Sequence, residues 1–155
     1  MLDLYNMAGH LIRRLNQIST SVFADRMKAE GLDLTPVQFG ALAALKTHPD
    51  VDQATLAGMI AHDRVTMGAV LDRLQNKGLV QRQISPHDRR ARVIRLTDAG
   101  HAALSRADPI VWALQTDILA GLTPEERTTF LHLLQKATEA GNDLSRAPLH
   151  PAADA

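Results

Sequence analysis

The segment that decides the fold is residues 88–100, DRRARVIRLTDAG, which joins a cluster of arginines to a short apolar strand and a helix start. Residues 91–96 have the apolar, β-branched character of a strand, and a similar segment, residues 79–85, precedes them. The residues between them, Pro86 to Arg90, are turn-forming and cationic. This order predicts a β-hairpin with a positively charged tip, followed by a helix that Thr97 caps.

Three short helices are predicted upstream of the hairpin. Residues 35–38, Thr-Pro-Val-Gln, combine an N-cap, a proline in the first turn and a capping-box glutamine, and so begin a helix that runs to about Thr47. Asp52 caps a second helix over residues 53–60, and a third runs from about Arg64 to Asn76. Short helices joined by tight turns, with cations at both ends of the last one, are typical of a helix-turn-helix.

Longer helices are predicted on both sides of this module. Apolar residues recur at spacings of three and four from about Asp3 to Ala29. Residues 98–120 form another helix, in which Pro109 predicts a kink or break, and a last helix follows Thr123 to about residue 140. The fold class is therefore mainly α with a small β-hairpin wing. We assign residues 35–97 to a winged helix-turn-helix domain, residues 1–34 and 98–143 to a helical dimerisation layer, and residues 144–155 to a disordered tail.

The charges of the chain are segregated although they balance. The 155 residues include 17 Lys and Arg and 17 Asp and Glu. Residues 62–97 hold eight basic residues against three acidic ones, a net charge of +5, which leaves −5 for the rest. A charge asymmetry of this kind gives information about binding partners rather than about the fold. It favours nucleic acid as the partner of the basic segment, residues 62–97.

Several classes of function are excluded by composition. Cysteine is absent, which rules out a disulfide scaffold, a thiol nucleophile and a cysteine-ligated metal site. The histidine spacing fits no metal motif and no catalytic constellation is present, so we expect no metal, no cofactor and no enzymatic activity. No apolar run approaches the ~20 residues that cross a bilayer, and the N-terminus lacks a secretory pattern. We therefore expect a cytoplasmic protein with no membrane partner.

The third short helix and the hairpin supply the candidate DNA contacts. The N-terminal part of a recognition helix enters the major groove, and a guanidinium suits phosphates, guanine edges and the minor groove. Asp88 can hold the hairpin loop and orient Arg90 through a carboxylate–guanidinium pair. Two alternatives stay open: Val65 and Met67 fit the core equally well, and hairpin charges also protect a sheet edge. The candidate DNA-binding residues are Arg64, Val65, Thr66, Met67, Gly68, Arg73, Lys77, Arg89, Arg90 and Arg92.

Residues 63–82 together with residues 88–100 resemble the MarR family of transcriptional regulators, and the resemblance covers about residues 5–142. It implies a winged-helix homodimer whose first and last two helices form the dimer layer. It also implies a pseudo-palindromic double-stranded DNA operator, with recognition helices in the major groove and wing arginines, Arg90 first among them, near the minor groove. A common role in the family is repression that a small aromatic or phenolic effector relieves.

A polar stripe on the first predicted helix is the candidate effector site. It consists of His10, Arg14, Gln17 and Ser21, at spacings of four, three and four, and Arg13 lies next to it. Similar regulators often accompany the degradation of aromatic acids, and the family pocket lies between the helical layer and the DNA-binding lobe. The resemblance implies that a carboxylate binds Arg13 or Arg14, with the ring of the acid or of its CoA thioester against Phe39 or Trp112. A solvated stripe or intersubunit salt bridges explain the same residues equally well.

A second class of function, a winged helix that docks a protein without specific DNA binding, keeps the same fold. The arginine-rich hairpin disfavours it, because a docking face exposes more apolar and aromatic residues. A steep salt dependence of DNA binding would distinguish the two. The sequence therefore predicts a ligand-responsive, homodimeric DNA-binding regulator that acts as a repressor.

Overall fold

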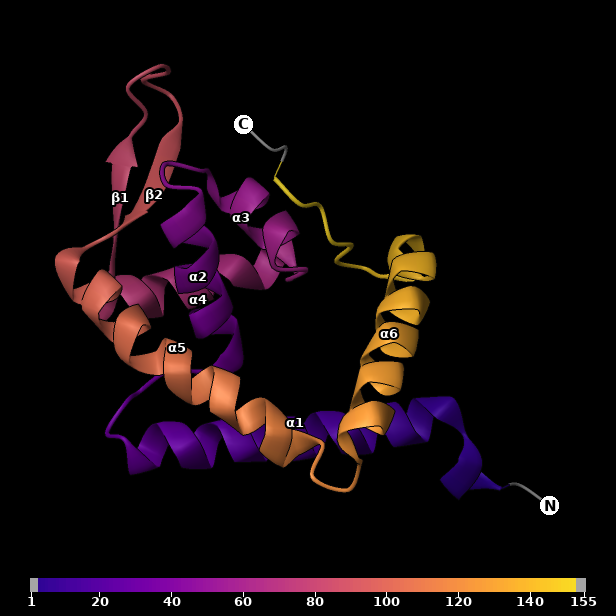
Figure 1. Ribbon diagram of the computed structural model, residues 1–155. Coiled ribbons are helices and arrows are strands. Elements are labelled where there is room, and N and C mark those ends of the chain that lie inside the picture. Colours follow the sequence, from indigo (N-terminus) through magenta and orange to yellow (C-terminus); the bar gives the residue numbers. More distant parts are fainter. Residues whose placement is uncertain (1–2, 153–155) are drawn as a thin grey trace.

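The computed structural model describes residues 3–152, which form a winged helix-turn-helix lobe above a layer of long helices (Figure 1). The 22-residue helix α1 forms the base, and α5 runs from the wing down to α1. The elements, in chain order, are η1 (Leu4–Asn6), α1 (Ala8–Ala29), α2 (Pro36–Thr47), α3 (Gln53–Met59), α4 (Arg64–Asn76), β1 (Val80–Ile84), β2 (Arg92–Leu96), α5 (Asp98–Ile118), α6 (Pro124–Ala140) and η2 (Asn142–Leu144). This order confirms the predicted fold class.

Side-chain caps set where the helices of the lobe begin. The Oγ1 of Thr35 accepts a hydrogen bond from the Gln38 backbone N–H at 3.2 Å, and Oε1 of Gln38 accepts one from the Thr35 backbone N–H at 3.3 Å, which completes the predicted capping box. Asp52 and Thr97 cap α3 and α5 in the same way, with single hydrogen bonds of 2.7 and 3.0 Å. These local contacts satisfy amide groups that the helices leave without partners.

The wing is an antiparallel pair in which Val80 lies opposite Leu96 and Ile84 lies opposite Arg92. Val51 extends this sheet by one bridge to Ile94. Val80, Ile94 and Leu96 are buried against the helices, whereas Ile84 is 62% exposed because it lies near the tip, beyond the body of the lobe. Ile84 is therefore an apolar strand residue that does not pack in the core.

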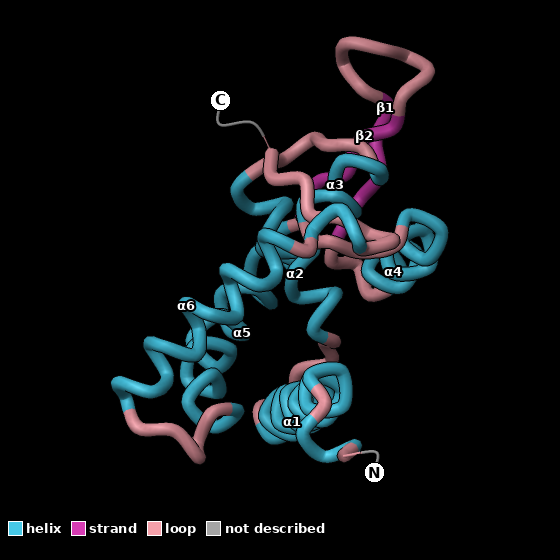
Figure 2. The backbone as a smooth tube through the Cα atoms, turned by 90° about the vertical axis from the view of Figure 1, so that its right-hand side faces the viewer, coloured by secondary structure: helices cyan, strands magenta, loops and turns pink. Residues whose placement is uncertain are grey.

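The core lies around α2, which contacts α3, α4, α5 and β2. Leu42 and Leu45 of α2 are fully or almost fully buried, together with Leu71 and Leu74 of α4. Figure 2 shows α2 between the wing lobe and the long helices. Helix α5 packs on α1, α2 and β2, and it therefore connects the layer of long helices to the winged helix-turn-helix lobe.

Two features of the C-terminal third differ from what the sequence led us to expect. Helix α5 continues through Pro109 without a break, and both Pro109 and Ser105, whose carbonyl the proline leaves without a helical donor, are exposed. The tail was predicted to be disordered, yet residues 144–152 follow a defined path that the side chain of Asn142 fixes through two hydrogen bonds to Leu149, of 2.8 and 3.1 Å. Residues 153–155 of that prediction lie outside the described residues.

Candidate DNA interface and effector cavity

The first turn of α4 presents its side chains to solvent. Asp63 caps the helix by accepting a hydrogen bond from the Val65 backbone N–H at 2.7 Å. Val65 is 90% exposed, and Arg64 and Thr66 are exposed beside it. The Thr66 hydroxyl lies 3.0 Å from Nε2 of His62. This end of α4 therefore has the polar and apolar groups that read base edges in a major groove.

Met67 is not a surface residue, which corrects the prediction that it contacts DNA. It is fully buried, as are Leu71 and Leu74, which follow it at helical spacing on the inner face of α4. Gly68, also predicted as a DNA contact, faces α3 instead. A Cβ at Gly68 would lie 3.3 Å from Nε2 of Gln53, so the missing side chain lets the two helices pack closely.

Lys77 holds the end of α4 to the segment before α2. Its ammonium group donates hydrogen bonds to the Asp33 backbone carbonyl at 2.7 Å and to Oε1 of Gln38 at 3.0 Å, and it forms an ion pair with the Asp33 carboxylate at 3.1 Å. Gln38 is only 4% exposed, and its Oε1 accepts from Lys77 as well as from the Thr35 N–H of the capping box. The predicted role of Lys77 as a phosphate ligand is therefore replaced by a structural one.

The wing tip is ordered by hydrogen bonds to its backbone. The Asp88 carboxylate accepts from the Arg90 backbone N–H at 2.9 Å, and the Ser85 hydroxyl accepts from the backbone N–H groups of His87 and Asp88. Asp88 thus holds the loop as predicted, but through the Arg90 backbone, and within residues 3–152 it forms no ion pair with a guanidinium.

Two arginines of the basic segment are neutralised inside the lobe. Arg82 forms an ion pair with Asp72 of α4 at 2.7 Å. Arg95 donates from Nε to Asp50 at 2.9 Å and also pairs through Nη2, and this hydrogen bonding to Asp50 raises the pKa of Arg95 above its usual value. Within the basic segment, residues 62–97, the exposed arginines with no side-chain partner among the described residues are Arg64, Arg73, Arg89, Arg90 and Arg92. The unpaired positive charge of this segment therefore lies on α4 and the wing.

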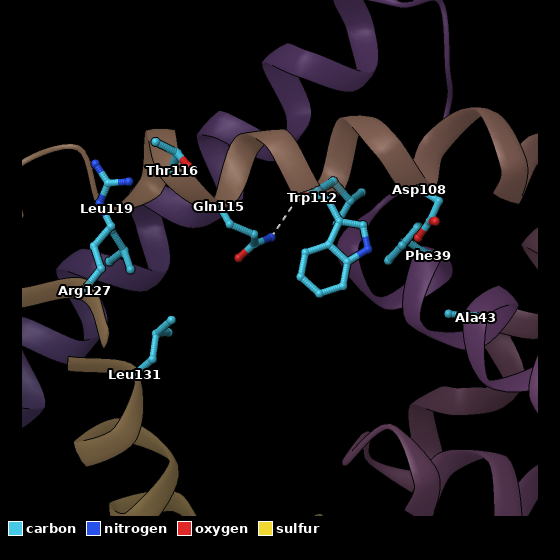
Figure 3. Close-up of a pocket in the computed structure, with 10 residues that line it drawn as sticks. Phe39, Ala43, Asp108, Trp112, Gln115, Thr116, Leu119, Arg127 and Leu131 are labelled. Atoms are coloured by element: carbon cyan, nitrogen blue, oxygen red, sulfur yellow. Dashed lines mark hydrogen bonds between the residues drawn. The ribbon is translucent and has the colours of Figure 1, made fainter. Parts of the chain in front are cut away.

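A cavity of about 630 Å³ lies between α2, α5 and α6, and Figure 3 shows the residues that line it. Phe39 of α2 and Trp112 of α5, both predicted to contact an effector, face it, and Trp112 is 73% exposed. Arg127 and Leu131 of α6 line the opposite side. An aromatic wall facing a cation across an apolar space is suited to a ring that carries a carboxylate.

His10, Arg13 and Arg14 do not line this cavity in the single chain. They lie on the first half of α1, where His10 packs edge-on against Tyr5 and its Nδ1 is 3.4 Å from the Arg13 guanidinium. The cation at the cavity is Arg127 instead, whose Nε donates to the Leu122 carbonyl at 3.2 Å. Sequence reasoning missed Arg127, because its spacing on α6 does not distinguish a cavity-lining cation from a solvated one.

Large apolar side chains remain exposed on α1 and α6. No residue of α6 is buried, although the helix is rich in leucine. Residues of α1, α5 and α6 also line a second apolar groove of about 380 Å³, which includes Leu11, Ile12 and Leu134. An apolar surface of this kind marks a contact with another molecule.

The three-helix module with an exposed recognition turn and an arginine-tipped hairpin defines a winged-helix DNA-binding protein. Comparison with known proteins narrows this class. The family model described as MarR family matches residues 32–91. The HTH-type transcriptional repressor NicR of Pseudomonas putida is 33% identical over 138 residues, which are 89% of this chain and 86% of NicR. The chain therefore belongs to the MarR family and is a transcriptional regulator.

Solved structures agree with this assignment. BpsR of Bordetella bronchiseptica, whose DNA binding is described as regulated by 6-hydroxynicotinic acid, superposes with a TM-score of 0.81 at 28% identity, covering 89% of this chain and 97% of BpsR. The transcriptional repressor CouR, solved on a 23-mer DNA duplex, has a TM-score of 0.78 at 31% identity, covering 88% and 95%. Such relatives are transcriptional regulators rather than enzymes. No helix within residues 3–152 has both the length and the apolar character needed to span a bilayer.

Proposed function

We propose that this protein is a homodimeric repressor that binds a pseudo-palindromic operator and is released by a small aromatic or phenolic acid or by its CoA thioester. The observation that carries the proposal is the separation of paired from unpaired arginines. Within the basic segment, residues 62–97, the arginines that pair with Asp50 and Asp72 stabilise the lobe, whereas those without side-chain partners lie on α4 and the wing. An exposed, uncompensated cation is the group that phosphates attract.

The dimer is supported by the exposed apolar surface of α1 and α6. Leucine and isoleucine side chains that are half-exposed or more in the single chain would be covered by the same helices of a second copy. A two-fold arrangement then places two recognition helices about one DNA turn, ~34–36 Å, apart.

The effector part of the proposal rests on the cavity between α2, α5 and α6. A volume of about 630 Å³ is within the usual range of roughly 300–1,000 Å³ for a small-molecule site. The ring would lie against Phe39 and Trp112, and Arg127 would bind the carboxylate in the place that we predicted for Arg13 or Arg14. 6-Hydroxynicotinic acid, which is described as regulating the DNA binding of BpsR, belongs to this chemical class.

Release requires that the effector bind the form unable to bind DNA more tightly than the competent form. For a hundredfold loss of operator affinity, the difference in binding free energy is about 2.7 kcal/mol. This is the scale that one charge-assisted hydrogen bond and one ring contact, made in only one of the two forms, can supply.

The experiment is a fluorescence-anisotropy titration of the protein into labelled duplex from the DNA upstream of its own gene, at several salt concentrations. If the dimer makes about eight phosphate contacts, the log–log salt slope is about −7. Arg90→Ala should weaken binding and flatten the slope, whereas Lys28→Ala, which removes a cation from the far end of α1, should change neither. An unchanged slope for Arg90→Ala would remove the wing from the mechanism.

Two further outcomes bear on the proposal. Aromatic acids and their CoA thioesters are added to the preformed complex, and release by one of them supports the effector assignment. Binding that is weak and insensitive to salt on operator and random duplexes alike would instead favour a protein-docking winged helix.

A further inference from the structure

The segment after α6, residues 142–152, lies against the DNA-binding lobe, and we call it the C-terminal strap. Figure 1 shows it leaving the top of α6 and turning back toward α3. The Asn142 side chain closes its first part into a loop through both hydrogen bonds to Leu149. The strap is therefore held in shape before it reaches the lobe.

The strap docks on the end of α3 through its backbone. The His150 N–H donates to the Gly58 carbonyl at 2.8 Å. Gly58 is buried, and a Cβ at this position would lie 3.3 Å from the Cβ of His150, closer than most real contacts. Gly58 thus leaves the room that the strap needs at the helix-turn-helix.

Docking brings Arg146 to the first turn of the recognition helix. A cavity of about 310 Å³ is lined by Arg64 and Val65 of α4 on one side and by Arg146 and His150 of the strap on the other. The Arg146 guanidinium lies 3.9 Å from the carboxylate of Asp63, the residue that caps α4, and the Arg146 side chain is 92% exposed. An exposed ion pair of this length contributes little stability, so Arg146 is free to exchange Asp63 for a phosphate.

We propose that the strap is part of the DNA-binding surface, in which Arg146 contacts a backbone phosphate beside the first turn of α4. The inference rests on the proposed function and extends it to a segment outside the winged-helix domain. Asp63 places a negative charge where DNA approaches, and Arg146 compensates for it. Because the strap is fixed by hydrogen bonds to Asn142 and Gly58, little conformational entropy is lost when the guanidinium meets the phosphate.

The test compares operator affinity and salt slope for the full-length wild type, Arg146→Ala, Arg146→Lys and Lys28→Ala. For two copies per dimer, Arg146→Ala should weaken binding about fivefold at moderate salt and make the slope less steep by about 1.8. Arg146→Lys should restore most of the slope, because the contact is to a phosphate rather than a base. Wild-type affinity and slope in Arg146→Ala would overturn the proposal, and so would an equal loss in Lys28→Ala.

A fourth variant, Asn142→Ala, keeps Arg146 but releases the loop that holds it. It should lose affinity as Arg146→Ala does, and trypsin should cut it after Arg146 faster than it cuts the free wild type. Equal cleavage of the two would show that the strap is not held and would overturn its role. If the wild type binds no duplex, the proposed function itself is refuted. If the wild type binds normally and Arg146→Ala binds equally well, only the role of the strap in DNA binding is refuted.

Discussion

Gly100→Ala tests a close contact between the helical layer and the wing. Gly100 lies in the first turn of α5, directly against the backbone carbonyl of Leu79 at the start of the wing. An added Cβ would lie 2.0 Å from that oxygen, and ordinary contacts begin at about 3.4 Å, so the two segments must separate by about 1.4 Å. The same carbonyl accepts the Thr97 backbone N–H at 3.1 Å, and the Thr97 hydroxyl donates to the Gly78 carbonyl at 2.6 Å. Separation therefore strains or breaks both hydrogen bonds.

The expected cost adds overpacking to lost hydrogen bonding. Overpacking a tight contact costs about 1–3 kcal/mol, and each hydrogen bond contributes about 1 kcal/mol. We therefore expect Gly100→Ala to lower the free energy of unfolding by about 3 kcal/mol, which for a chain of this size lowers Tm by about 6–12 °C.

The assay is thermal unfolding followed by circular dichroism, with wild type and variants at one protein concentration because a dimer's Tm depends on concentration. The control is Gly9→Ala in the first turn of α1, where an added Cβ meets nothing within 4 Å. Alanine has the better helix propensity, so the control should leave Tm unchanged or raise it slightly. A Gly100→Ala Tm within about 2 °C of the wild type would refute the close approach of α5 to Leu79.

Three other predictions concern residues whose roles the structure changed or added. Lys77→Ala should lower the free energy of unfolding by about 1–2 kcal/mol, because it removes the charged donor to the buried Gln38 side chain and the ion pair with Asp33, and should leave the DNA salt slope unchanged; a flatter slope would restore the phosphate role. Met67→Ala should lower the free energy of unfolding, measured by chemical denaturation, by about 2–5 kcal/mol. Val65→Ala should lower it by less than about 0.5 kcal/mol and should alter discrimination between operator variants. Equal losses of stability would contradict the assignment of the two residues to opposite faces of α4. Trp112 is the only tryptophan, so 6-hydroxynicotinic acid or a related acid in the cavity should change its fluorescence, and Arg127→Met should weaken that binding at least about tenfold if Arg127 holds the carboxylate.

The parts of the fold that the sequence predicted well are those that local chemistry determines. The threonine and aspartate caps at Thr35, Asp52 and Thr97 lie at the predicted helix starts, because a side-chain oxygen within three residues of an unpaired N–H is a local signal. Gly31 and Gly78 have the positive φ values of 66° and 73° that a chain reversal after a helix requires. The charged hairpin followed from the same kind of short-range pattern.

The errors came from contacts between residues far apart in the chain. The sequence pattern predicted Lys77 as a phosphate ligand, but its ammonium group donates a hydrogen bond to the backbone carbonyl of Asp33, 44 residues earlier. The tail has few large apolar residues, yet one asparagine and one buried glycine give residues 144–152 a fixed path. Arg127 reaches the cavity only because the turn before α6 directs that helix back toward α5, and no local spacing indicates this.

The geometry of α5 explains how a ligand in the cavity would reach the DNA-binding surface. Trp112 lies twelve residues from Gly100 on one uninterrupted helix, a distance of roughly 18 Å along its axis. At the Gly100 end the helix lies against the Leu79 carbonyl with no side chain between them, so a displacement of α5 cannot be absorbed there by a rotamer change. A ligand that displaces α5 itself would therefore displace the base of the wing as well. Gly100 would then contribute to regulation as well as to stability. A residue with a flexible side chain at this position would separate α5 from the Leu79 carbonyl and would let α5 move without the wing.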